Sequence, residues 1–129
     1  MALITTTEIQ KMLNNIWPNL QQIWCFDPEY ICPTLTEVTD FIAENWIDTS
    51  AIKADNPDCD DFALQLHAKV KAAINWSFGE AFGNKIQGWS VLHNLNICCC
   101  QNSVILIDPL EKVIWEADRN DDNILWVRM

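Results

Sequence analysis

Cys59 stands at the start of a predicted helix, in the stretch "DCDDFAL". Asp58 before it is a residue type that caps helix N-termini, and apolar residues follow at the helical period. A helix N-terminus lowers the pKa of a thiol and so favours the nucleophilic thiolate. Carboxylates oppose this effect, but those of Asp60 and Asp61 do so only weakly if they point to solvent. Cys59 is therefore a candidate nucleophile, with a buried structural thiol as the alternative.

A thiol nucleophile needs a general base, and the base needs an acceptor that orients it. The chain has two histidines. His67 follows Cys59 by two turns of the same helix, about 12 Å along the axis, so we expect it on the solvated face and out of reach. His93 lies in an alternating segment, residues 89–99, on the face that also carries Trp89. His93 is thus the candidate base.

Asp108 ends the next apolar segment, residues 103–108. A turn of two or four residues around positions 100–102 would join this segment to the strand of His93. With either turn, strand parity places Asp108 opposite or diagonal to His93 on the same face. A carboxylate there could hold one imidazole nitrogen and leave the other free for sulfur, so we expect Asp108 to orient the base.

These three residues carry a resemblance. "DCDDFAL", His93 at the end of "GWSVLH" and Asp108 at the end of "ILID" resemble papain-like and transglutaminase-like cysteine peptidases. The chain is similar to the bacterial transglutaminase-like cysteine peptidases and to the C-terminal protease domain of the fungal agglutinins, over roughly residues 40–116. The resemblance implies that Cys59 is the nucleophile, His93 the base and Asp108 the orienting acid.

The same resemblance opens further candidates. The agglutinin proteases use a glutamate as the acid, which makes Glu116 a rival to the aspartate. Papain-like enzymes often add a side-chain amide to the oxyanion hole, and Asn45 and Asn56 are the candidates beside the backbone amide of the nucleophile. We expect Trp46 or Trp89 to line a substrate groove.

The metal content stays open. The agglutinin proteases are calcium-activated, so the resemblance makes calcium possible, although the acidic spacing matches no EF-hand loop. The hard oxygen ligands on offer are Asp58, Asp60, Asp61, Asp118, Asp121 and Asp122. The "CCC" run at 98–100 does not predict zinc, because alternation turns its middle cysteine away and no second pair follows at zinc spacing. No other cofactor is expected.

Composition limits the class of protein. A chain of 129 residues, 50% of them hydrophobic, predicts one globular domain over residues 1–129. Six cysteines without a signal peptide favour reduced thiols and a cytoplasmic location. The net charge of −10 argues against nucleic acid or an anionic membrane as a partner, and the apolar runs are too short to span a bilayer. We expect a protein or peptide substrate, with the oligomeric state open.

Helical patterns come first and strand patterns follow. Capping boxes at Thr5–Glu8 and Thr34–Glu37 begin two of the three predicted helices, and residues 78–88 read as a loop because they hold every glycine of the chain. The predicted helices are at residues 5–17, at 34–46 and from 59, and the predicted strands at 89–99, 103–108, 112–117 and 123–128. This order predicts an α+β protein with N-terminal helices packed on an antiparallel sheet, and the resemblance to the cysteine peptidases implies a minimal papain-like fold.

Two functions fit these features. The first is a cysteine-dependent hydrolase, a peptidase or amidase that forms a thioester on Cys59 and then hydrolyses it. The second is a non-enzymatic binding or assembly subunit, of a phage or bacterial particle, that retains the fold without the chemistry.

Overall fold

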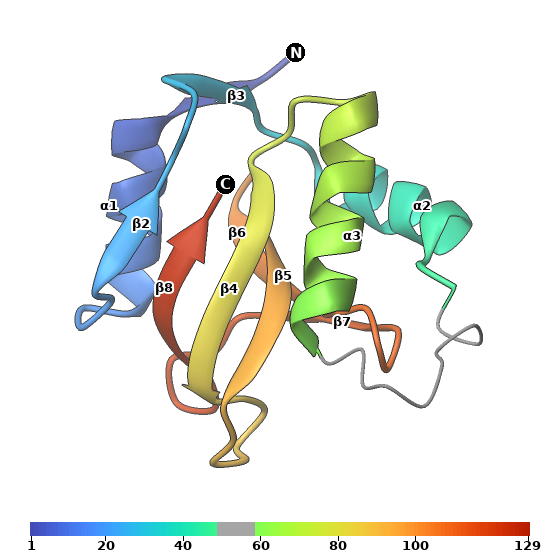
Figure 1. Ribbon diagram of the computed structural model, residues 1–129. Coiled ribbons are helices and arrows are strands. Elements are labelled where there is room, and N and C mark those ends of the chain that lie inside the picture. The colour runs from blue at the N-terminus through green and yellow to red at the C-terminus, as the bar shows by residue number, and fades with distance from the viewer. Residues whose placement is uncertain (49–58) are drawn as a thin grey trace.

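The computed structural model describes residues 1–48 and 59–129, with residue 59 represented by its backbone. Helices and strands share this part of the chain, which makes the protein α+β, as predicted (Figure 1). In chain order the elements are β1 (Leu3–Thr5), α1 (Thr6–Ile16), β2 (Gln22–Trp24), β3 (Glu29–Ile31), α2 (Leu35–Asn45), α3 (Cys59–Ala73), β4 (Phe78–Lys85), β5 (His93–Cys100), β6 (Ser103–Asp108), β7 (Val113–Glu116) and β8 (Asn123–Arg128).

The central feature is a six-stranded sheet in the order β2-β8-β4-β5-β6-β7. Its neighbours are antiparallel except for β2 and β8, which run parallel, so the sheet is mixed rather than purely antiparallel. A separate pair, β1 and β3, lies near the N-terminus. Helices cover both faces, with α1 on one side and α2 and α3 on the other (Figure 1).

Alternation along β5 divides the core into two apolar clusters. Leu95 and Ile97 pack with α1, whereas Cys98 and Cys100 pack with α2 and α3. A strand covered on both faces reads as a continuous apolar run, which explains why β5 lacks a polar face at this end. The cysteine run is therefore core, and its thiols are reduced.

The first two helices begin where the sequence predicts. Thr5 and Thr34 are the N-caps, and the backbone amide and side chain of Glu8 and Glu37 complete the two capping boxes. Within residues 1–48 and 59–129, no helix has both the length and the apolar character needed to cross a bilayer.

The expected loop at residues 78–88 is wrong, because most of it is the central strand β4. Its glycines mark close backbone approach rather than a turn. A Cβ at Gly79 would overlap the carbonyl oxygen of Arg128, and one at Gly83 would lie 2.7 Å from that of Asn123. Only glycine lets β8 pair this closely, through an irregular register, with β4.

The predicted start of β5 at residue 89 is also wrong. Ile86 and Trp89 exchange two backbone hydrogen bonds of 2.9 Å across Gln87 and Gly88, which have φ of 49° and 82°. Positive φ at both central residues makes this a tight turn of the type that joins antiparallel strands. Trp89 therefore lies in the turn, 76% exposed, and does not share a strand face with His93.

The two glycine sites predict different responses to one added methyl group. Gly79→Ala should lower the free energy of unfolding by more than about 3 kcal/mol, because the methyl group meets backbone that cannot move without breaking the β4–β8 pairing. Gly88→Ala is the matched control, since it has space but a φ of 82°, and should cost about 1 kcal/mol. Urea denaturation measures both, and equal losses would contradict the close-approach explanation.

Candidate active site

The β5–β6 hairpin brings His93 and Asp108 together. Its turn has two residues, because Cys100 pairs with Ser103. The same register, continued, places Asp108 opposite Leu95 and therefore diagonal to His93. His93 Nε2 lies 3.1 Å from Asp108 Oδ2, and both side chains are mostly buried. This confirms the expected pairing of the two residues.

Asp108 is fixed at both oxygens. Oδ1 accepts the backbone amides of Leu110 and Glu111 at 3.0 and 3.3 Å, while Oδ2 holds His93. Burial by itself would raise the pKa of this carboxyl group. The hydrogen bond and charge of His93, together with the two amides, outweigh burial, so the pKa of Asp108 lies below its usual value. The group is ionised at neutral pH and holds the ring in one orientation.

The imidazole keeps one nitrogen available. With Asp108 ionised, Nε2 of His93 carries the hydrogen that it donates to Oδ2. In the neutral form of the ring Nδ1 carries no hydrogen, and it has no partner in the described part of the chain. The ring can therefore accept a proton at Nδ1.

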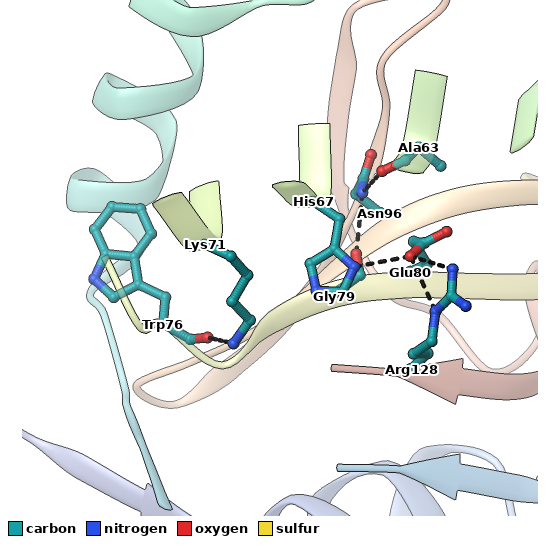
Figure 2. A network of polar contacts seen from close by, with 8 residues as sticks. All are labelled: Ala63, His67, Lys71, Trp76, Gly79, Glu80, Asn96 and Arg128. Carbon is teal, nitrogen blue, oxygen red and sulfur yellow. Dashed lines mark hydrogen bonds and ion pairs between the residues drawn. The ribbon is translucent and has the colours of Figure 1, made fainter. Parts of the chain in front are cut away.

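Asn96 fixes the level of α3 along the sheet. Its buried Nδ2 donates to the carbonyl of Ala63 in α3 at 2.8 Å and to that of Gly79 in β4 at 3.1 Å (Figure 2). Cys59 precedes Ala63 by four residues, about 6 Å of helix, and His93 precedes Asn96 by three, about 10 Å of strand. Figure 1 shows α3 beginning at the end of the sheet where β5 begins and β6 ends.

His93 begins β5 and Asp108 ends β6, so the pair lies at the open end of the hairpin. Because side chains alternate along a strand, both positions belong to the face of the sheet where Leu95 packs with α1, whereas α3 packs on the other face. The backbone positions alone place the start of α3 and His93 at the same end of the sheet, on opposite faces of it. The sulfur of Cys59 and its distance from His93 lie outside the described residues.

Other candidates lie elsewhere. Glu116 is exposed in β7, opposite Ile105, and lines a cavity next to α1, while the carboxylate that contacts His93 is that of Asp108. Asn45 donates its side-chain amide to the carbonyl of Phe41 at 2.7 Å, within α2. Asn56 and Asp58 fall outside the described residues.

The tryptophans named as groove residues have different surroundings. Trp46 is partly buried against the cluster under α2 and α3, and Trp89 lies in the turn before β5. The groove beside the start of α3 is lined instead by Phe82 and Trp126, from β4 and β8.

The acidic residues do not assemble a calcium site in the described part of the chain, where no three potential ligands converge. Asp122 is buried and already accepts three N–H groups. Oδ1 receives the amide of Gln87 at 2.8 Å, and Oδ2 receives the amide of Asp118 at 3.0 Å and the indole of Trp115 at 3.2 Å. Asp122 thereby stabilises the loop before β8.

The sequence predicted that His67 lies on a solvated face, and this is wrong. His67 is part of a polar network (Figure 2). Its Nδ1 lies 2.8 Å from Glu80 Oε2, and Arg128 donates to the same oxygen from Nε at 3.2 Å and from Nη2 at 2.8 Å. Burial would raise the pKa of Glu80, but the hydrogen bonds and charges of His67 and Arg128 bring it below its usual value. Glu80 escaped the sequence analysis because its strand was read as a loop.

The low pKa of Asp108 predicts a pH-dependent stability. A depressed carboxyl pKa stabilises the fold fully above the ordinary value of 3.8, and the contribution disappears as the pH falls through the lower folded-state pKa. Asp108→Asn should therefore cost about 1–2 kcal/mol at pH 7 and progressively less in acid. Urea denaturation from pH 7 to 2.5 measures the difference. Asp40→Asn, an exposed control on α2, should change the free energy of unfolding by less than about 0.5 kcal/mol, and a pH-independent loss for Asp108→Asn would refute the assignment.

Comparison with known proteins adds the fold. No protein-family model and no curated protein matches this chain. A solved structure, the PSL1a-E64 complex, is similar with a TM-score of 0.75 and 18% identity, over 98% of this chain and 51% of that one. The chain thus spans about half the length of PSL1a. At this identity the similarity establishes a shared fold.

Proposed function

We propose that this protein is a cysteine-dependent hydrolase of peptide or other amide bonds, with Cys59 as nucleophile, His93 as general base and Asp108 as its orienting acid. The observation that carries the proposal is the His93–Asp108 hydrogen bond of 3.1 Å, at the end of the sheet where the helix of Cys59 begins. A thiol nucleophile needs a base whose ring is held at one nitrogen, as His93 is by Asp108, and whose other nitrogen, here Nδ1, has no partner among the described residues.

The chemistry follows from this arrangement. Nδ1 of His93 takes the proton of the Cys59 thiol, and the thiolate attacks the carbonyl carbon of the amide. The N-terminal amides of α3 stabilise the oxyanion that forms. The imidazolium, held by Asp108, gives its proton to the leaving amine, which departs and leaves a thioester. Water, deprotonated by the same Nδ1, then hydrolyses the thioester and regenerates the thiol.

The shared fold supports the same proposal. The similar structure is a complex of PSL1a with E64, and E64 is an inhibitor of cysteine proteases. This fits the resemblance of the "DCDDFAL", His93 and Asp108 motifs to papain-like and transglutaminase-like cysteine peptidases. We propose a protein or peptide as the substrate.

Selective labelling tests the nucleophile. At pH 6–7, iodoacetamide and E64 should modify Cys59 at least about tenfold faster than any other thiol, because the helix N-terminus and His93 favour its thiolate. The remaining cysteines provide internal controls. Cys32 and the run at 98–100 are buried, and burial raises the pKa of the half-buried Cys25. Intact-mass spectrometry followed by peptide mapping identifies the modified residue.

Two variants separate the base from an effect of the helix alone. His93→Ala should remove the advantage of Cys59, whereas Lys69→Gln, a change at an exposed position on the same helix as the thiol, should keep it. Cys59→Ser should abolish labelling and alter the free energy of unfolding by only about 1 kcal/mol. If Cys25 is labelled faster than Cys59, or if His93→Ala leaves the labelling rate of Cys59 unchanged, the hydrolase proposal is refuted and the binding or assembly subunit is favoured.

A further inference from the structure

A groove of about 350 Å³ lies beside the start of α3, between this helix and strands β4, β5 and β8. We call it the α3–β8 groove. It is lined by Asp60, Asp61, Glu80, Phe82, Trp126 and Arg128, with Leu64 and Asn94 completing the wall.

The groove adjoins the proposed active site. Asp60 directly follows the nucleophile Cys59, and Asn94 directly follows the base His93. A peptide whose scissile bond lies at the start of α3 would therefore place a neighbouring side chain at this groove.

The electrostatic character of the groove is negative. The described residues that line it carry three carboxylates, those of Asp60, Asp61 and Glu80, and one guanidinium, that of Arg128. The guanidinium is already bound to Oε2 of Glu80, which also receives His67. All the dashed contacts of Glu80 in Figure 2 meet at this one oxygen. Oε1 of the same buried carboxylate has no hydrogen-bond partner in the described part of the chain, which leaves it an acceptor for a bound donor.

The floor of the groove is aromatic. The rings of Phe82 and Trp126 stack with centroids 5.5 Å apart and planes inclined by 14°. Aromatic faces attract cations and also pack against the methylene groups of long basic side chains. An acidic side chain would meet three carboxylates here, and an aliphatic one would displace water from them without replacing its hydrogen bonds.

We propose that the α3–β8 groove binds a lysine or arginine side chain of the substrate, so that the enzyme prefers basic peptides. This specificity rests on the proposed hydrolase function for its use in catalysis. The net charge of −10 acts in the same direction, because it attracts cationic peptides to the protein.

Binding to a protein without the nucleophile tests the groove by itself. Cys59→Ala, with Cys59→Ser as a second variant should the first fail to fold, is titrated with blocked pentapeptides Ala-Ala-X-Ala-Ala in which X is lysine, norleucine or glutamate. NMR spectra of the amides and of the Trp126 indole report binding. The lysine peptide should bind about tenfold more tightly than the norleucine peptide, and the glutamate peptide most weakly.

Charge variants locate the preference. Asp60→Asn combined with Asp61→Asn should remove most of the lysine advantage, and Phe82→Leu part of it. The matched control, Asp40→Asn with Glu44→Gln, removes two exposed charges from α2 and should leave the preference unchanged. Equal affinity for lysine and norleucine peptides, or the same loss in the control, would overturn the proposal.

The two proposals fail differently. Lysine binding at the groove without thiol reactivity in the wild-type protein would refute the hydrolase and leave a site for basic peptides. Labelling of Cys59 and cleavage of lysine and norleucine peptides at the same kcat/KM would refute the groove assignment and leave the hydrolase.

Discussion

The buried amide of Asn96 is the interaction on which the site depends. One nitrogen bonds a carbonyl of α3 and a carbonyl of β4, so a single side chain of β5 joins three elements. Without these two carbonyls the buried Nδ2 would lie unpaired in an apolar interior, where an unpaired polar group costs about 1–3 kcal/mol. Sliding α3 along the sheet would break these contacts, and this fixes the height at which the helix begins.

The same face of α3 is held along its length. Ala63, His67 and Lys71 recur every four residues and contact Asn96, Glu80 and the carbonyl of Trp76 in turn (Figure 2). Positions four apart lie above one another on a helix, so these contacts form one polar seam between α3 and the sheet. A helix fixed by directional bonds as well as apolar packing holds its first residue in place, as a nucleophile requires.

Two imidazole–carboxylate pairs illustrate how position decides a role. His67 and Glu80 meet where the guanidinium of Arg128 also binds the buried carboxylate and balances its charge. His93 and Asp108 meet at the end of the sheet, and Nδ1 of the ring is left without a partner among the described residues. The first pair serves packing and the lining of the α3–β8 groove, whereas the second is the pair to which we assign proton transfer in the proposed hydrolase.

Features that depend on short-range geometry could be predicted from the sequence. Capping boxes set the starts of α1 and α2, and strand parity across a two-residue turn paired His93 with Asp108. Contacts between distant segments could not be predicted in this way, because they form only when the chain folds. The glycines of β4 predicted a loop, but in the fold they lie against the backbone of β8. His67 was predicted to face solvent, but in the fold it contacts Glu80. The sequence pattern around a residue reflects its neighbours along the chain, whereas its role depends on partners from distant segments that only the folded chain places next to it.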